Sequence, residues 1–124
     1  MIKTLLAVGI GGALGSIARF GTSYVIKKTW VHTLPWATFT TNILGCLMIG
    51  IFVGYFEKNN ISESPYRWFL ITGFCGGYTT FSTFALENRD LLLQNQMGNA
   101  LLYSMSSVCL GILAVYFGLW LVSK

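Results

Sequence analysis

The chain alternates between four long apolar stretches and three short polar connections. Each stretch is long enough for a helix that crosses the hydrocarbon core of a bilayer, which takes roughly 20 residues. We therefore predict four transmembrane helices, over residues 4–26, 36–56, 67–87 and 100–122. Because they use nearly the whole chain, we predict one all-α membrane domain, residues 1–124, without a separate soluble domain.

The third stretch contains a cluster that a plain membrane helix does not need. Residues 73–84 include three glycines, four Thr or Ser hydroxyls and three phenylalanines. Adjacent glycines and a block of Thr and Ser both weaken a helix. In hydrocarbon a break is tolerated only where the freed backbone groups are buried in protein or line a polar cavity. The pattern therefore predicts a broken third helix whose break, near mid-membrane, serves the function.

The composition also favours a membrane protein. Hydrophobic residues make up 54% of the chain and charged residues 10%, whereas an ordinary soluble domain is about 25% charged. The first stretch has the alternative interpretation of a signal peptide, since Lys3 precedes an apolar run. Its glycines make a poor signal core and Arg19 follows it, so we favour a retained helix. Gly11 and Gly15 have the spacing with which membrane helices pack closely.

Two polar side chains within the apolar stretches are candidates for function. Asn42 must find partners in a membrane helix. Its amide either bonds a neighbouring helix or lines a pore, where its NH₂ group can meet an anion. Arg19 either extends its charged end to the membrane surface or provides a cation that attracts anions to a vestibule.

Aromatic rings and hydroxyls form a second group of candidates. Phe81 and Phe84 are three residues apart, which places them on one side of a helix. The edge of a phenyl ring is positive and can face an anion, although packing against lipid or core is the ordinary use of such rings. Tyr103 and Ser107 are four apart and share a face, with bonds back to their own helix as the alternative.

The basic residues are balanced between the two ends of the predicted helices. Four crossings put both termini and the connection near residue 60 on one side. Its basic residues are Lys3, Lys58, Arg67 and Lys124, and those of the other side are Arg19, Lys27, Lys28 and Arg89. Since an excess of Lys and Arg orients membrane helices, this balance predicts insertion in both orientations and pairing with an inverted copy. Carbonyls freed at the two helix breaks would converge near the two-fold axis and suit a small hard cation.

Other function classes find little support. No nucleophile–base pair, metal-ligand cluster or phosphate loop is present, so we predict that the protein is not an enzyme. The three cysteines fall in separate apolar stretches and are interpreted as packing residues. A small multidrug-type dual-topology exporter needs a carboxylate in its first helix, and this stretch has none. A non-transporting membrane scaffold remains an alternative.

Three motifs, in order along the whole chain, resemble a known family. They are Gly11-Gly-x-x-Gly15-x-x-x-Arg19-Phe20, Thr38-x-x-x-Asn42-x-x-Gly45 and Gly73-Phe-x-Gly-Gly-x-Thr-Thr-Phe-Ser-Thr-Phe84. This pattern is similar to that of the CrcB/Fluc bacterial fluoride channels, and the last motif is its most specific part. Several positions depart from the family, among them Cys46, where Ser is common, and Gly111, where some members carry a further Ser; the others are Ser16, Phe20, Ala37 and Thr41.

The resemblance implies a fold, a function and a set of site residues. It implies an antiparallel, dual-topology homodimer with two fluoride pores, passive export of cytoplasmic fluoride, and a structural Na⁺ at the dimer centre. It also implies a multi-pass protein of the bacterial cell (inner) membrane. The implied pore residues are Asn42, Phe81, Ser82, Thr83, Phe84, Tyr103 and Ser107; Arg19 and Glu87 would lie nearer the pore mouths, and the backbone carbonyls of Gly76 and Thr79 would bind the Na⁺.

Overall fold

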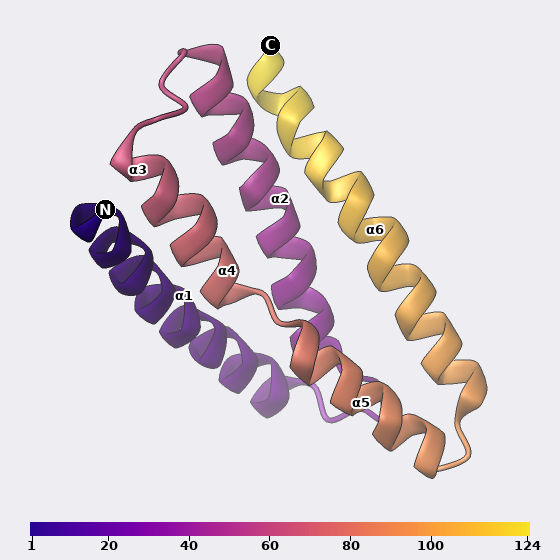
Figure 1. Ribbon diagram of the computed structural model, residues 1–124. Coiled ribbons are helices and arrows are strands. Elements are labelled where there is room, and N and C mark those ends of the chain that lie inside the picture. The colour runs from indigo at the N-terminus through magenta and orange to yellow at the C-terminus, as the bar shows by residue number, and fades with distance from the viewer.

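The computed structural model describes residues 1–124 and contains helices and connections but no strand (Figure 1). Three helices are long and apolar enough to cross a membrane: α1 (Ile2–Thr29), α2 (Trp36–Lys58) and α6 (Met97–Ser123). Only 16 of the 124 residues are buried, so most of the apolar side chains on these helices face outward, as a bilayer requires. The predicted all-α class and the multi-pass membrane character are therefore confirmed.

The remaining predicted stretch is divided into shorter pieces. A continuous helical rod comprises α3 (Pro65–Arg67), the π-helical segment η1 (Trp68–Cys75) and α4 (Gly76–Tyr78), and α5 (Phe81–Leu93) follows it. Between them the backbone is extended, with ψ values of 159° at Thr79 and 124° at Thr80. Neither piece alone has the roughly 20 residues of a spanning helix.

The helices run past the predicted spans at several ends. Lys27 and Lys28 lie in the last turn of α1, where cations interact favourably with the helix dipole. In α5 the helix does not stop near Glu87, as the charged residues after it suggested, but continues to Leu93. The reason is that helical hydrogen bonds do not depend on apolar side chains, so hydropathy marks the hydrocarbon and not the helix end.

Small residues let the rod of α3, η1 and α4 lie directly on α1, as the glycine spacing predicted. Gly11 and Gly15 are buried. A Cβ atom at Gly11 would overlap the Phe69 carbonyl oxygen, and one at Gly15 would overlap that of Phe74. The contact is therefore backbone to backbone, and it fixes the rod that leads into the extended residues.

A second close contact joins α2 to α6. Gly50 lies against the backbone of Val115, and Gly118 lies against the backbone of Leu47. At the end of the pair, Lys58 Nζ donates a hydrogen bond to the Val122 carbonyl (3.0 Å). Figure 1 shows both termini toward the same end of the molecule as the α2–α3 connection. The elements that surround the site are thus held by two glycine-mediated contacts.

Candidate functional site

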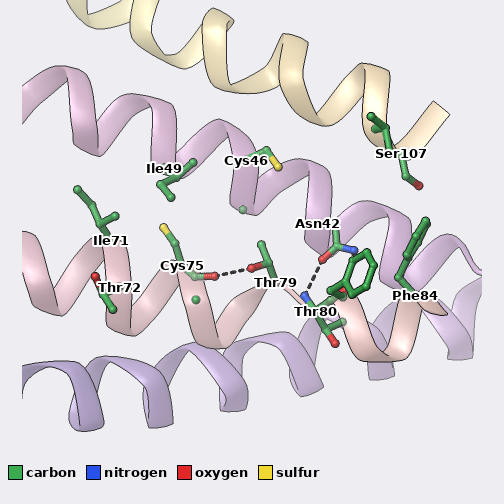
Figure 2. Close-up of a pocket in the computed structure, with 14 residues that line it drawn as sticks. Asn42, Cys46, Ile49, Ile71, Thr72, Cys75, Thr79, Thr80, Phe84 and Ser107 are labelled. Atoms are coloured by element: carbon green, nitrogen blue, oxygen red, sulfur yellow. Dashed lines mark hydrogen bonds between the residues drawn. The ribbon is translucent and has the colours of Figure 1, made fainter. Parts of the chain in front are cut away.

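A cavity of about 540 Å³ lies where α2, η1, the extended residues and α6 approach one another (Figure 2). Its lining includes six of the predicted site residues: Asn42, Gly76, Thr79, Phe81, Phe84 and Ser107. Most of the other lining residues are apolar or carry a hydroxyl, and no acidic or basic side chain lines the cavity. The cavity therefore offers hydrogen-bond donors and ring edges without any formal charge.

The Asn42 side chain holds the extended backbone in place. Its Oδ1 accepts a hydrogen bond from the Thr80 N–H (2.7 Å), and its Nδ2 donates to the Thr80 carbonyl (3.0 Å). Figure 2 shows Asn42 reaching from α2 to Thr80. The amide thus pairs with Thr80 as a neighbouring strand would pair with it. One of the two N–H bonds of the NH₂ group is not used by Thr80.

The hydroxyls near the break bond the helix ends on either side of it. Thr79 Oγ1 donates to the Cys75 carbonyl (2.9 Å). Thr80 Oγ1 accepts from the Thr83 N–H (3.2 Å), which makes Thr80 the N-cap of α5. Ser82 Oγ lies 3.4 Å from Thr80 Oγ1, and both Ser82 and Thr83 are exposed. These bonds explain how a break is stable between two helices.

The break also frees a carbonyl group. In a continuous helix the Gly76 carbonyl would accept from the N–H four residues on, at Thr80. That N–H donates to Asn42 instead. Gly76 is exposed, and a Cβ atom built on it meets nothing within 4 Å.

Three aromatic rings follow one another from α5 to α6. The ring centroids of Phe81 and Phe84 are 5.7 Å apart, and those of Phe84 and Tyr103 are 5.0 Å apart. Phe81 is 79% exposed, whereas Tyr103 is 4% exposed. Phe81 therefore extends outward from the chain, while Phe84 packs against α6.

Two of the predicted pore hydroxyls are buried without a partner at hydrogen-bonding geometry, Tyr103 Oη and Ser107 Oγ. Thr38 and Glu87 lie close to the Tyr103 hydroxyl, whereas Ser107 has no such neighbour. An unpaired buried hydroxyl is costly, by about 1–3 kcal/mol, so such groups call for a ligand or water as partner. The alternative predicted for each residue, a hydroxyl bond back to its own helix, does not form.

The two residues predicted near the pore mouths lie outside the cavity lining. Glu87 accepts a hydrogen bond from the Thr38 hydroxyl, which joins α5 to α2. Arg19 is half-buried on α1 and makes no ion pair, since the single ion pair of the chain is Arg89–Asp90 (3.1 Å). Their placement at pore mouths stays a prediction.

Sequence reasoning missed several groups at this site. Thr80 was not singled out, although the need of Asn42 for a partner and the nearby break together pointed to it. Cys46 also lines the cavity and had been interpreted only as a packing residue. No group of three His, Cys, Asp or Glu side chains is arranged to hold a metal ion.

Comparison with known proteins shows which family the chain matches. Residues 6–119 match the family described as CrcB-like protein, Camphor Resistance (CrcB). A "Fluoride-specific ion channel FluC" of Flavobacterium psychrophilum is 54% identical over 95% of this chain and 95% of the relative. A protein with the same name from Azobacteroides pseudotrichonymphae is 42% identical over 95% of this chain and 94% of that relative. Another from Chlorobium phaeobacteroides is 43% identical over 94% of this chain and 90% of that relative.

Proposed function

This chain belongs to the CrcB-like protein family, and we infer that it is a fluoride channel, not an enzyme, through which fluoride crosses the membrane passively. The observation that carries this function is the cavity, which combines an amide, hydroxyls and phenyl ring edges and has no charged side chain. A small anion loses its water on entry and needs donors in exchange. Carboxylates would repel it.

We propose that the donors act in sequence along the cavity wall. The N–H of Asn42 not used by Thr80 and the unpaired Ser107 hydroxyl are available to an anion. Phe81 and Phe84 would present positive ring edges. Tyr103 lies outside the cavity lining; its ring packs against Phe84, and its hydroxyl lies near Thr38 and Glu87. Ser82 and Thr83 would add hydroxyls from the exposed first turn of α5.

We propose further that two inverted copies form the channel, with two pores per dimer. The cavity lies at the surface of one chain, and Phe81 beside it is 79% exposed. A second copy would cover both. The equal numbers of basic residues at the two ends support insertion in both orientations. In this arrangement residues 65–93 act as a fourth, broken span, and the bacterial inner membrane is the expected location.

The Gly76 and Thr79 carbonyls are suited to a Na⁺ ion. In a continuous helix the Thr80 N–H would donate to the Gly76 carbonyl, but here it donates to Asn42. Uncharged oxygen ligands such as this carbonyl are typical of a monovalent-cation site. Two inverted copies would contribute two carbonyls each. The ion would supply a positive charge that holds the two breaks together at the dimer centre.

Removing sodium should weaken the dimer. We expect that purification with N-methyl-D-glucamine in place of Na⁺ lowers the dimer fraction and the fluoride efflux, because four carbonyls would face one another without a cation. Size-exclusion chromatography and efflux assays measure the two effects, and re-adding Na⁺ serves as the control. Unchanged dimer and efflux after verified sodium removal would argue against the site.

A liposome assay tests the function itself. We expect fluoride efflux from proteoliposomes, followed with a fluoride electrode, and no comparable chloride efflux. Phe81→Ile should lower the fluoride rate by roughly fivefold to tenfold, because a ring-edge interaction is worth about 1 kcal/mol. Phe117→Ile is the matched control, since Phe117 is an exposed ring of α6 that stacks on Trp120 (5.6 Å) and lies outside the cavity lining.

The same assay separates the alternatives. Fluoride release no faster than from protein-free liposomes would contradict the channel. Equal rates for the Phe81 and Phe117 variants would favour a route that does not use the cavity. The multidrug-type exporter has no support in α1, which contains no acidic residue.

A further inference from the structure

One pair of polar side chains joins α5 to α6 next to Phe84. Ser104 Oγ donates to Asn88 Oδ1 (2.8 Å), and Asn88 Nδ2 donates to the Phe84 carbonyl (2.9 Å). The two helices also approach each other at Glu87 of α5, which lies close to the Tyr103 hydroxyl of α6. A single amide thus connects the backbone of Phe84 to the helix that carries Tyr103 and Ser107.

The Phe84 ring lies between the rings of Phe81 and Tyr103, at the edge of the cluster that includes Leu91 and Ala100. The ring rests on Tyr103, with centroids 5.0 Å apart. Phe84 also borders two cavities, the one of about 540 Å³ described above and a second of about 510 Å³. Asn88 and Ser104 line the second cavity. Open space therefore lies on two sides of Phe84, and the hydrogen bond from Asn88 to its carbonyl helps to fix its position between them.

The α5 helix as a whole has few apolar anchors. Leu91 is its only buried residue. Its remaining cross-helix side-chain bonds go to α2: Thr38 with Glu87, and Asn42 with the Thr80 cap. Against α6, the helix that carries Ser107, α5 is held by the Asn88–Ser104 hydrogen bond and by the approach of Glu87 to Tyr103. Losing the hydrogen bond would let the Phe84 end of α5 move relative to Ser107.

We propose that Asn88 and Ser104 are positioning residues that set the distance of the Phe84 ring from the Ser107 hydroxyl and thereby the rate and selectivity of fluoride passage. The proposal rests on the fluoride-channel function. Neither residue contacts the main cavity. They act through the Phe84 backbone.

The test measures fluoride and chloride efflux per folded dimer for a small set of variants. Ser104→Ala and Asn88→Ala should each lower fluoride efflux about tenfold, as expected for one hydrogen bond. They should also reduce the ratio of fluoride to chloride efflux. The double variant should be no slower than the slower single variant, because the two residues form one unit. Ser104→Thr keeps the hydroxyl and should retain the wild-type rate.

Ser106→Ala is the matched control. Ser106 lies on the same helix, and its hydroxyl bonds only its own helix, at the carbonyls of Leu102 (2.6 Å) and Tyr103 (3.2 Å). Ser104→Cys, nearly equal in size to the wild type and a weak donor, replaces Ser104→Ala if that variant does not fold, and should also slow efflux. Thermal unfolding in detergent is measured for every variant.

The outcomes are distinct. A wild-type fluoride rate and selectivity in Ser104→Ala and Asn88→Ala would overturn the proposal, as would a lowered unfolding temperature with unchanged selectivity. Equal losses in Ser106→Ala would do the same. If the wild-type protein released no fluoride, the proposed channel function itself would be contradicted. The variants alone cannot give that result, so failure of the function and failure of the positioning proposal can be told apart.

Discussion

We expect Asn42→Asp to lower fluoride efflux from proteoliposomes by roughly a thousandfold, while the protein still inserts into the membrane. One carboxylate oxygen can still accept from the Thr80 N–H, as Oδ1 does now (2.7 Å). The second carboxylate oxygen replaces the Nδ2 group that donates to the Thr80 carbonyl. Two hydrogen-bond acceptors, this oxygen and the Thr80 carbonyl oxygen, would then face each other. A negative charge also enters a cavity lined by no charged side chain. Like charges about 4 Å apart repel by about 4 kcal/mol at an effective dielectric constant near 20, which is about a thousandfold in rate.

Asn59→Asp is the matched control for this substitution. Asn59 follows α2, and its Nδ2 also donates to a backbone carbonyl, that of Tyr55 (2.8 Å), but it is exposed and lies outside the cavity lining. Efflux of Asn59→Asp should equal that of the wild type. If Asn42→Asp conducted fluoride at the wild-type rate, the cavity would not be the path of the anion.

The sequence predicted that Asn42 needs a partner but could not identify it. An amide in an apolar helix must be satisfied, and the glycines and hydroxyls of residues 73–84 indicated a break that leaves backbone groups unpaired. Matching the two requires the position of α2 against Thr80, 38 residues further along the chain. Such a long-range contact leaves no periodic signal in one sequence.

The same limit applies to the glycines and to the hydroxyls. The spacing of Gly11 and Gly15 predicted a close helix contact, and the structure identifies the partner as the Phe69–Phe74 backbone. The shared face of Tyr103 and Ser107 was evident from their spacing. That both hydroxyls would be buried without a partner could not be predicted, because it depends on which helices cover that face.

Helix ends were predicted least well, for a physical reason. Hydropathy reports where hydrocarbon begins, whereas α5 continues through Glu87 and Asn88 to Leu93. This extension brings Glu87 to Thr38 and Asn88 to Ser104. The polar contacts that orient α5 are thus made by residues that the sequence pattern had assigned to a helix end.

Gly15→Ala destabilises the folded protein by about 3 kcal/mol, the largest stability effect that we expect from a single added methyl group. The new Cβ atom would overlap the Phe74 carbonyl oxygen and lie 2.9 Å from the Tyr78 backbone nitrogen. Backbone atoms cannot move aside as a flexible side chain can, so α1 and the rod of α3, η1 and α4 must separate, and overpacking of this kind costs about 1–3 kcal/mol. Separation would also remove the contact between the Thr22 and Tyr78 hydroxyls (3.1 Å).

Gly21→Ala is the matched control, because it adds the same methyl group to the same helix at a position where nothing lies within 4 Å. Alanine favours a helix over glycine by about 1 kcal/mol, so this variant should be as stable as the wild type or more so. The midpoint temperature of thermal unfolding in detergent measures both variants. Equal temperatures would mean that α1 does not pack closely on the rod. Since Tyr78 directly precedes Thr79 and Thr80, a lower temperature for Gly15→Ala should be accompanied by slower fluoride efflux.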